Sequence, residues 1–331
     1  MKVPPLIWRW SIAIAGGVFL LAAIGLAGWR WGENTLKAPG PHETQIIVNF
    51  PRGASLAEIA SRLEGAGAIE HAWLFRIAAL MTGDARKLKA GEYAFPPHAS
   101  PHMILAKLVR GEIYLHRMGF AEGLSVGQIL PRIAAHEALS GELPPPPAEG
   151  SLLPETYLFP RGETRAGLIA RMQAAQKTLL AKLWPARAPD LPLNTPEEAV
   201  ILASIVEKET ALAAERARIA GVFYNRLKLN MPLQSDPTVV YARDQGRYNP
   251  KPLSQADLAL KSPYNTYLHT GLPPGPIAAP GKAALKAVLN PESTEALYFV
   301  ADGNGGHAFA ATLKEHNRNV AAYRKRSGSA Q

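Results

Sequence analysis

Cysteine is absent from the 331 residues of this sequence. Without thiols, the chain forms no disulfide, binds no metal through thiolates and has no cysteine nucleophile. The absence fits an oxidising compartment, where a stray thiol is a liability, although many cytosolic chains also lack cysteine. It excludes these kinds of chemistry without fixing where the protein works.

Acidic residues are scarce relative to basic ones, with 27 Asp and Glu against 36 Lys and Arg, a formal net charge of +9. This excess of positive charge implies an anionic partner. Nucleic acid, anionic lipid headgroups and a carboxylate-rich cell-wall polymer all qualify. Because no RNP, zinc-finger or helix-turn-helix signature accompanies the charge, we expect no nucleic-acid partner.

Patterns suited to a metal or a phosphate group are also missing. His98 and His102 span a helix start rather than one helix face, and His136 lacks the second histidine of a zinc-protease helix. The glycine-rich turn at residues 302–306 lacks the lysine and spacing of a phosphate-binding loop. We therefore expect neither a metal nor a cofactor.

A G-x-S-x-G pattern at residues 123–127 matches the nucleophile turn of serine hydrolases and precedes an expected helix. Nothing in the spacing of the later histidines ties them to Ser125. Ser55 and Ser100 stand before two other expected helices. All three serines share one sequence frame: an apolar residue four positions later, a basic residue at seven and an aliphatic residue at eight. We therefore interpret Ser125 as a third helix cap, and a serine hydrolase is the competing hypothesis.

The N-terminal part contains an uncharged run at residues 10–29, long enough to cross a bilayer, which takes about 20 apolar residues. Tryptophans flank the run at both ends, as in an interfacial aromatic belt. The basic residues before it favour a cytoplasmic N-terminus and an exported remainder. A cleaved signal peptide is the alternative, although its apolar core normally spans about 7–15 residues. We predict a cytoplasmic segment at residues 1–9 and a membrane-spanning helix at 10–31.

The rest of the chain reads as an α+β fold in two parts after a Pro- and Gly-containing linker at residues 32–44. We predict a small α+β subdomain at residues 45–120 and a larger mixed α/β domain at 121–323. Residues 324–331 read as a basic, flexible tail, with fraying expected from about residue 317. The elements expected within these parts are strands at 45–50 and 91–95, helices from Ser55, His71 and Ser100, a helix at 169–183, a helical run from 196 to about 230 broken near 211–214, and a hairpin at 297–312.

The stretch at residues 199–241 carries the strongest candidate chemistry. Thr195 and Pro196 suit the start of a helix that contains two acids, Glu207 and Glu209. Residues two apart on a helix point in nearly opposite directions, so the two acids do not form a carboxylate pair. Glu209 shares its face with larger apolar residues, and loss of hydration there raises the pKa of a carboxyl toward that of a general acid. On pattern alone, two surface acids balanced by Lys208 and Arg216 explain the stretch equally well.

Several ordered motifs resemble one family. ASIVEKET, VFYNRL, LQSDPTVVYA, SPYNTY, TGLPPGPIAAPG and YFVADGNGGHAF occur in that order over roughly residues 89–317. The chain in this region resembles the MltG-type (YceG-like) endolytic murein transglycosylases, which are membrane-anchored enzymes that cut peptidoglycan glycan strands. The resemblance implies that the catalytic acid is the second glutamate of the E-K-E-T motif, which is Glu209 here. It also implies a LysM-like subdomain at residues 45–120, where GASLAEIASRL alone is only a weak signal.

Candidate sugar-binding residues come from three segments. The loop at residues 262–270 combines aromatic faces with amide and hydroxyl groups, as an acetamido-sugar site requires, although a plain loop has the same composition. In the turn at 234–237, Asp236 either orients a sugar hydroxyl or closes an Asx turn. The acid at 155 matches an acidic position of the family and equally suits a structural turn. The predicted substrate-binding residues are Glu155, Gln234, Ser235, Asp236, Tyr264, Asn265, Thr266 and Tyr267.

The resemblance implies a lyase reaction that needs one acid rather than the usual two carboxylates. Glu209 would protonate the oxygen between N-acetylmuramic acid and N-acetylglucosamine, then accept the proton of the C6 hydroxyl as a 1,6-anhydro ring closes. The expected location is the inner membrane, with a single span and the C-terminal domains in the periplasm. Peptidoglycan is the expected substrate, and peptidoglycan synthases are candidate partners. The alternative function is a membrane-tethered peptidoglycan-binding scaffold without catalysis.

Overall fold

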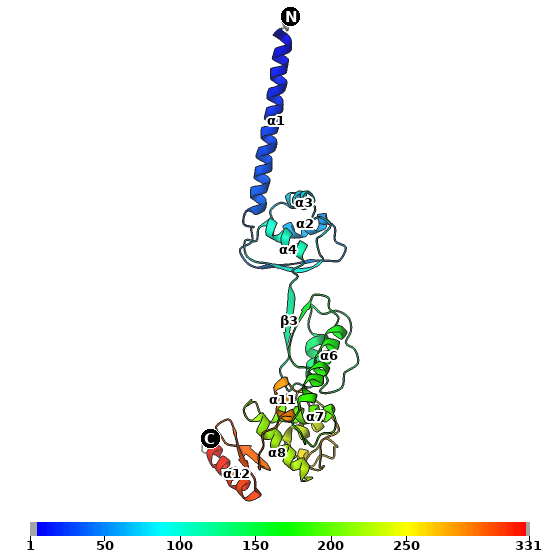
Figure 1. Ribbon diagram of the computed structural model, residues 1–331, viewed down its shortest axis with the longest axis vertical. Coiled ribbons are helices and arrows are strands. Elements are labelled where there is room, and N and C mark those ends of the chain that lie inside the picture. Colours follow the sequence, from blue (N-terminus) through cyan, green and yellow to red (C-terminus); the bar gives the residue numbers. More distant parts are fainter. Residues whose placement is uncertain (1–4, 329–331) are drawn as a thin grey trace. The chain divides into compact units, whose positions relative to one another are not determined.

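The computed structural model describes residues 5–328 as a mixed α/β protein with one N-terminal apolar helix (Figure 1). The chain divides into two compact units, Met1–His116 and Arg117–Gln331. The boundary falls within β3 (Leu115–Gly119), close to the predicted end of the small subdomain at residue 120.

Helix α1 (Pro5–Lys37) includes a candidate membrane span, Ile12–Lys37, whose apolar side chains are exposed. The expected membrane helix at residues 10–31 lies within α1, whereas the segment at 1–9 falls partly outside the described residues. The predicted linker begins later than expected, because α1 continues through residues 32–37. An ion pair between Lys37 and Glu33 (2.6 Å) one turn apart supports these last turns, which also pack on α3 and α4 of the same unit.

The rest of unit 1 is a two-stranded antiparallel sheet covered by three helices. Strand β1 (Ile46–Phe50) pairs with β2 (Gly91–Phe95), with Val48 opposite Tyr93. Alternate residues of β1 point into a core shared with the helices, so β1 buries only one of its two faces. This arrangement confirms the strands and helices predicted between residues 45 and 110. The helices are α2 (Leu56–Gly65), α3 (Ala72–Met81) and α4 (Pro101–Arg110).

The three serines that share a sequence frame all stand at helix N-termini. Ser55 accepts a hydrogen bond from the amide of Glu58 (3.1 Å) at the start of α2, and Ser100 accepts one from Met103 (3.2 Å) at the start of α4. Ser125 precedes α5 (Val126–Ala134), is buried, and donates its hydroxyl to the carbonyl of Gly246. The interpretation of Ser125 as a helix cap is confirmed.

Unit 2 begins with a small layer around one apolar cluster. Strand β3 pairs with β4 (Thr156–Pro160), and α5 and α6 (Arg165–Leu183) pack against them around Ile129, Phe159 and Met172. A short 3-10 turn, η1 (Trp184–Ala186), follows α6. The helix that carries Glu207 and Glu209 follows this layer in the chain.

The centre of unit 2 is a helical core. Helices α7 (Pro196–Glu209), α8 (Arg216–Lys228) and α11 (Lys282–Leu289) pack around a cluster that includes Leu202, Ile205 and Phe223. The predicted break in the helical run is confirmed, because six residues separate α7 from α8. Two short helices, α9 (Asp236–Asp244) and α10 (Gln255–Leu258), follow.

The C-terminal part is a hairpin with a helix against it (Figure 1). Strands β5 (Tyr298–Ala301) and β6 (His307–Ala310) pair antiparallel, which confirms the predicted hairpin. The expected fraying from residue 317 is wrong for the described part, because α12 (Leu313–Gly328) continues through it. The ring of its His316 stacks on the Tyr298 ring, with centroids 5.2 Å apart, and so connects the helix to the hairpin. Residues 329–331 of the predicted tail lie outside the described residues.

Candidate active site

Glu209 is the last helical residue of α7. The helix begins where Thr195 accepts the amide of Glu198 (3.2 Å), and Pro196 occupies its first turn. A capping box would also need the Glu198 carboxylate to accept the Thr195 amide. It accepts the amide of Asn194 instead, so only half of the box forms. At the other end, Thr210 turns to an extended backbone. The Glu209 side chain therefore emerges at the negative end of the helix dipole, which disfavours a second negative charge.

Burial raises the pKa of Glu209 from 4.5 to about 7. The residue is half-buried, and the carboxylate of Asp236 raises the pKa further by repulsion. A hydrogen bond from Ser235 and electrostatic interactions with His307 and Arg226 oppose the rise. The carboxyl therefore exists in both protonation states near neutral pH.

Ser235 is the direct partner of this carboxyl: it donates its Oγ hydrogen to Oε1 of Glu209. Ser235 is itself buried, and its amide donates to Oγ1 of Thr266 (3.0 Å). Thr238 lies beside both, with its Oγ1 at 2.6 Å from the Ser235 carbonyl and 2.8 Å from Thr266 Oγ1. These buried hydroxyls hold Ser235 in place beneath Glu209.

Asp236 and Tyr267 form a second pair next to the carboxyl. The Tyr267 hydroxyl donates to Oδ1 of Asp236 (2.6 Å), and Asp236 lies at the exposed start of α9. Burial and the Asp236 carboxylate both raise the pKa of Tyr267, which keeps its phenol protonated as a donor. The pair places one anionic and one aromatic group beside Glu209.

The turn that carries Ser235 is fixed by a buried arginine. Gln234 adopts a left-handed backbone (φ 52°), and its amide donates to the Thr266 carbonyl (3.0 Å). Arg226 donates to the carbonyls of Leu233 (2.8 Å) and Leu297 (2.7 Å), and its own pKa is lowered by burial. Arg226 thus joins α8, the turn and the hairpin, and adds positive charge near Glu209.

His307 was not among the sequence-predicted site residues. It lies on β6, and its Nδ1 is 2.6 Å from Oε2 of Glu215, whose Oε1 accepts the His307 amide (2.9 Å). It also lowers the pKa of Glu209, which links the hairpin electrostatically to the carboxyl. The signal was present in the GGHAF motif, but no spacing rule links a hairpin histidine to a helix 98 positions away in the numbering. Arg226 and Glu215 were missed for the same reason.

The structure does not bring all predicted residues to Glu209. Asn265 is fully buried, and its amide donates to the carbonyls of Leu258 and Leu260 (both 2.9 Å), so it holds the loop together. Tyr264 packs on Tyr241, with ring centroids 4.9 Å apart. Glu155 is exposed at the start of β4, next to the core of α5 and α6.

Glu207 has a different role from Glu209. Its side chain is 4% exposed, lies 3.1 Å from Arg216 and accepts the amide of Gly281 (2.9 Å). Burial raises its pKa, while these two donors favour its charged form. The different partners of the two acids confirm that they point apart and leave Glu207 as a clamp between α7, α8 and the start of α11.

Comparisons of this chain with known proteins all match one family. The YceG-like family model matches residues 48–322. An endolytic murein transglycosylase of Bacillus subtilis is 32% identical over 342 residues, covering 94% of this chain and 91% of that protein. An endolytic murein transglycosylase of Streptococcus pneumoniae is 31% identical over 92% of this chain and 63% of its own longer sequence.

A solved structure agrees with the sequence comparisons. The crystal structure of a YceG-like protein from Listeria monocytogenes superposes with a TM-score of 0.55 at 31% identity, covering 83% of this chain and 98% of that one. The family match spans more than half of the chain, and the relatives exceed 30% identity over nearly its whole length. The chain belongs to the YceG-like family.

Proposed function

We propose that this chain is an endolytic murein transglycosylase, a lyase of peptidoglycan glycan strands, with Glu209 as its general acid and base. The relatives that carry this name span more than nine tenths of the chain. The observation that carries the assignment of Glu209 is its pKa of about 7, reached in a half-buried setting against a serine hydroxyl. The alternative, a peptidoglycan-binding scaffold without catalysis, is not favoured.

In the first step, protonated Glu209 donates its proton to the glycosidic oxygen between N-acetylmuramic acid and N-acetylglucosamine. The bond from the muramic C1 to that oxygen breaks, and the N-acetylglucosamine hydroxyl leaves with the proton. A pKa near the working pH keeps the acid form populated. Positive charge develops on the muramic ring, and the Asp236 carboxylate, close enough to Glu209 to raise its pKa, is proposed to stabilise that charge.

In the second step, the Glu209 carboxylate removes the proton from the C6 hydroxyl of the same muramic ring. Oxygen O6 then bonds to C1 and closes the 1,6-anhydro ring, so no water is consumed. Ser235 stabilises the ionised carboxylate between the two steps, and the charges of Arg226 and His307 act in the same direction. One side chain therefore serves both proton transfers and is returned to its starting state.

The predicted substrate contacts divide into three groups around Glu209. Asp236, its partner Tyr267 and the neighbouring Gln234 are proposed to bind sugar hydroxyls and the acetamido group. Ser235 and Thr266 support the acid, and Asn265 shapes the loop. Tyr264 and Glu155 are proposed as contacts with parts of the glycan strand farther from the cleaved bond.

The proposed location is the inner membrane, with α1 as a single span, its start in the cytoplasm and the two units in the periplasm. The apolar span and the terminal tryptophans support this placement. The helix-capped α+β part of unit 1 is proposed to be a LysM-like subdomain that binds glycan. The net charge of +9 suits carboxylates of the peptide stems.

Digestion of isolated sacculi tests the proposed function. The purified full chain is expected to release muropeptides with 1,6-anhydro ends, each one water lighter than the hydrolysed equivalent by mass spectrometry. Internal cutting shortens the mean strand length before small fragments accumulate. Sacculi that stay intact while the protein binds them would indicate the scaffold function instead.

A further inference from the structure

Helix α3 is apolar on both sides, which is unusual for a helix at a protein surface. One side packs into the core of unit 1 through Leu74, Phe75 and Ala79. The other side is open: Trp73 is 50% exposed, Ile77 44%, Leu80 61% and Met81 58%. Helical spacing brings these four side chains onto one face, here called the α3 outer face. Helices that are apolar all round normally lie inside a large protein or in lipid.

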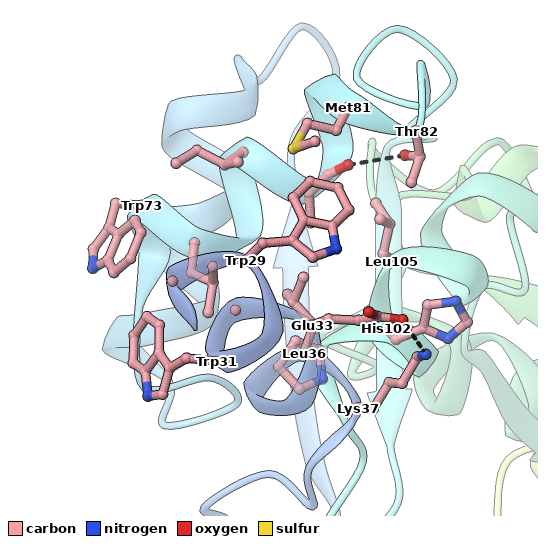
Figure 2. A pocket seen from close by; sticks show the side chains of 16 residues that line it. Trp29, Trp31, Glu33, Leu36, Lys37, Trp73, Met81, Thr82, His102 and Leu105 are labelled. Atoms are coloured by element: carbon pink, nitrogen blue, oxygen red, sulfur yellow. Dashed lines mark hydrogen bonds and ion pairs between the residues drawn. The ribbon is translucent and has the colours of Figure 1, made fainter. Parts of the chain in front are cut away.

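The α3 outer face continues into a groove against the end of α1. The groove has a volume of about 620 Å³ and is lined mainly by apolar residues of α1, α3 and α4. Figure 2 shows Trp29 and Trp31 of α1 on one side, with Trp73 and Met81 of α3 nearby. The Trp31 and Trp73 rings stack with centroids 5.9 Å apart and planes 17° apart. The apolar surface of α3 is therefore continuous with that of α1.

The end of α1 indicates whether lipid or water surrounds the α3 outer face. Ile12–Lys37 is the candidate membrane span, and its apolar side chains are exposed because lipid is their expected environment. Tryptophans concentrate where a bilayer meets water, so Trp29 and Trp31 mark the level at which α1 leaves the membrane. Since Trp73 stacks on Trp31, the α3 outer face starts at that same level.

The charges around α3 also suit a lipid headgroup layer. Arg76 is the only charged residue of the helix and is exposed between Trp73 and Ile77. An arginine on an apolar face can lay its stem along the surface and extend its guanidinium to phosphate. Arg86, exposed just beyond the end of α3, adds positive charge, whereas Lys87 is paired with Asp84 (2.9 Å).

We propose that the α3 outer face docks onto the same bilayer that α1 crosses, with its apolar side chains among the upper acyl chains and Arg76 at the phosphates. This inference rests on the membrane anchoring given under the proposed function and goes beyond it, because a single span can tilt and rotate in the bilayer without placing α3 against lipid. Two adjacent attachments, α1 and α3, would hold unit 1 in one orientation on the membrane surface.

The cysteine-free sequence makes a direct test simple, because any introduced cysteine is the only thiol. Full-length variants Ile77→Cys and Leu80→Cys, labelled with bimane, would be placed one copy per nanodisc with phospholipids that carry nitroxides on their acyl chains. Ile47→Cys is the matched control: it lies in the same unit on the open face of β1, and Ile47 is 46% exposed against 44% for Ile77. Leu21→Cys, within α1, reports on the anchor itself.

We expect strong loss of bimane fluorescence at positions 21, 77 and 80, and little at 47, relative to discs without nitroxide. Quenching at 21 without quenching at 77 and 80 would overturn the docking of α3 while leaving the anchor intact. If position 21 is also unquenched, the membrane anchor fails and the inference with it. One copy per disc excludes cover by a second chain, and unchanged melting temperatures identify variants that remain folded.

Discussion

Ser235 Oγ donates a hydrogen bond to Oε1 of Glu209, although the two residues are 26 positions apart in the chain. The bond favours the carboxylate, whereas burial favours the neutral acid and prevails, so the pKa of Glu209 is raised to about 7. Near neutral pH the residue can therefore donate a proton and accept one back. This balance is what a one-carboxylate lyase requires.

Replacement of Ser235 by alanine tests this balance. Because the bond lowers the pKa of Glu209, its loss should raise that pKa and move the alkaline limb of activity upward by about one pH unit. The carboxylate also becomes a less stabilised intermediate state, so kcat should fall by about tenfold at neutral pH. The measurement is the pH dependence of fragment release from sacculi. A limb that stays in place or moves downward would show that Ser235 does not control Glu209.

The pH dependence of stability should also reflect the raised pKa of Glu209. The pKa of Glu209 is about 7 in the fold against 4.5 for the free carboxyl, so the folded state binds its proton more tightly. The cost of ionising it is absent below about pH 4.5, grows from there to pH 7 and is complete above pH 7. Glu209→Gln removes that cost and should stabilise the protein by up to about 3 kcal/mol at pH 8, and by little at pH 4.5. Denaturant midpoints of the two proteins across this range are the check, and a constant difference would contradict the raised pKa.

His307 should affect the acid through charge. Since His307 lowers the pKa of Glu209, His307→Gln should raise that pKa and move the alkaline limb upward, as Ser235→Ala does but by less than a pH unit. Glu215→Gln, which weakens the support of the imidazole, should act in the same direction. Rate profiles of the two variants test the arrangement. An unchanged limb with a uniform fall in rate would leave His307 with a purely structural role.

Glu207 should matter for stability. Glu207→Gln leaves Arg216 short of a buried counter-charge and weakens the bond to the Gly281 amide, which should cost about 1–3 kcal/mol. Glu197→Gln, an exposed acid in the first turn of the same helix, is the matched control, with an expected change of about 0.5 kcal/mol. Chemical denaturation of both variants measures the difference. Equal midpoints would mean that the clamp contributes nothing.

Local signals in the sequence predicted most elements, and together with the family resemblance they singled out Glu209 as the candidate acid. Serine caps and apolar spacing located α2, α4 and α5, and the position of Glu209 on a bulky apolar stripe indicated a raised pKa. The same spacing also put Leu212 on the face of Glu209, but Leu212 lies beyond the end of α7 and is exposed. Residue spacing along one helix does not show where that helix ends.

Partners that come from distant segments could not be predicted in the same way. The hydroxyl of Ser235, the guanidinium of Arg226 and the imidazole of His307 reach Glu209 only through the packing of α8, α9 and the hairpin. Asn265 illustrates the reverse error: its amide suits a sugar, yet neighbouring carbonyls use both of its donor hydrogens. Composition shows what a side chain can bind, and tertiary packing decides what it meets.

The most direct measurement compares Glu209→Gln with Glu207→Gln in the digestion of isolated sacculi, with 1,6-anhydro ends counted by mass spectrometry. Both variants must first show cooperative unfolding at the assay temperature. Loss of proton transfer predicts that Glu209→Gln releases about a thousandfold fewer ends, while Glu207→Gln retains most of the activity. Equal losses in the two variants, or ends released by Glu209→Gln at the wild-type rate, would contradict Glu209 as the proton carrier.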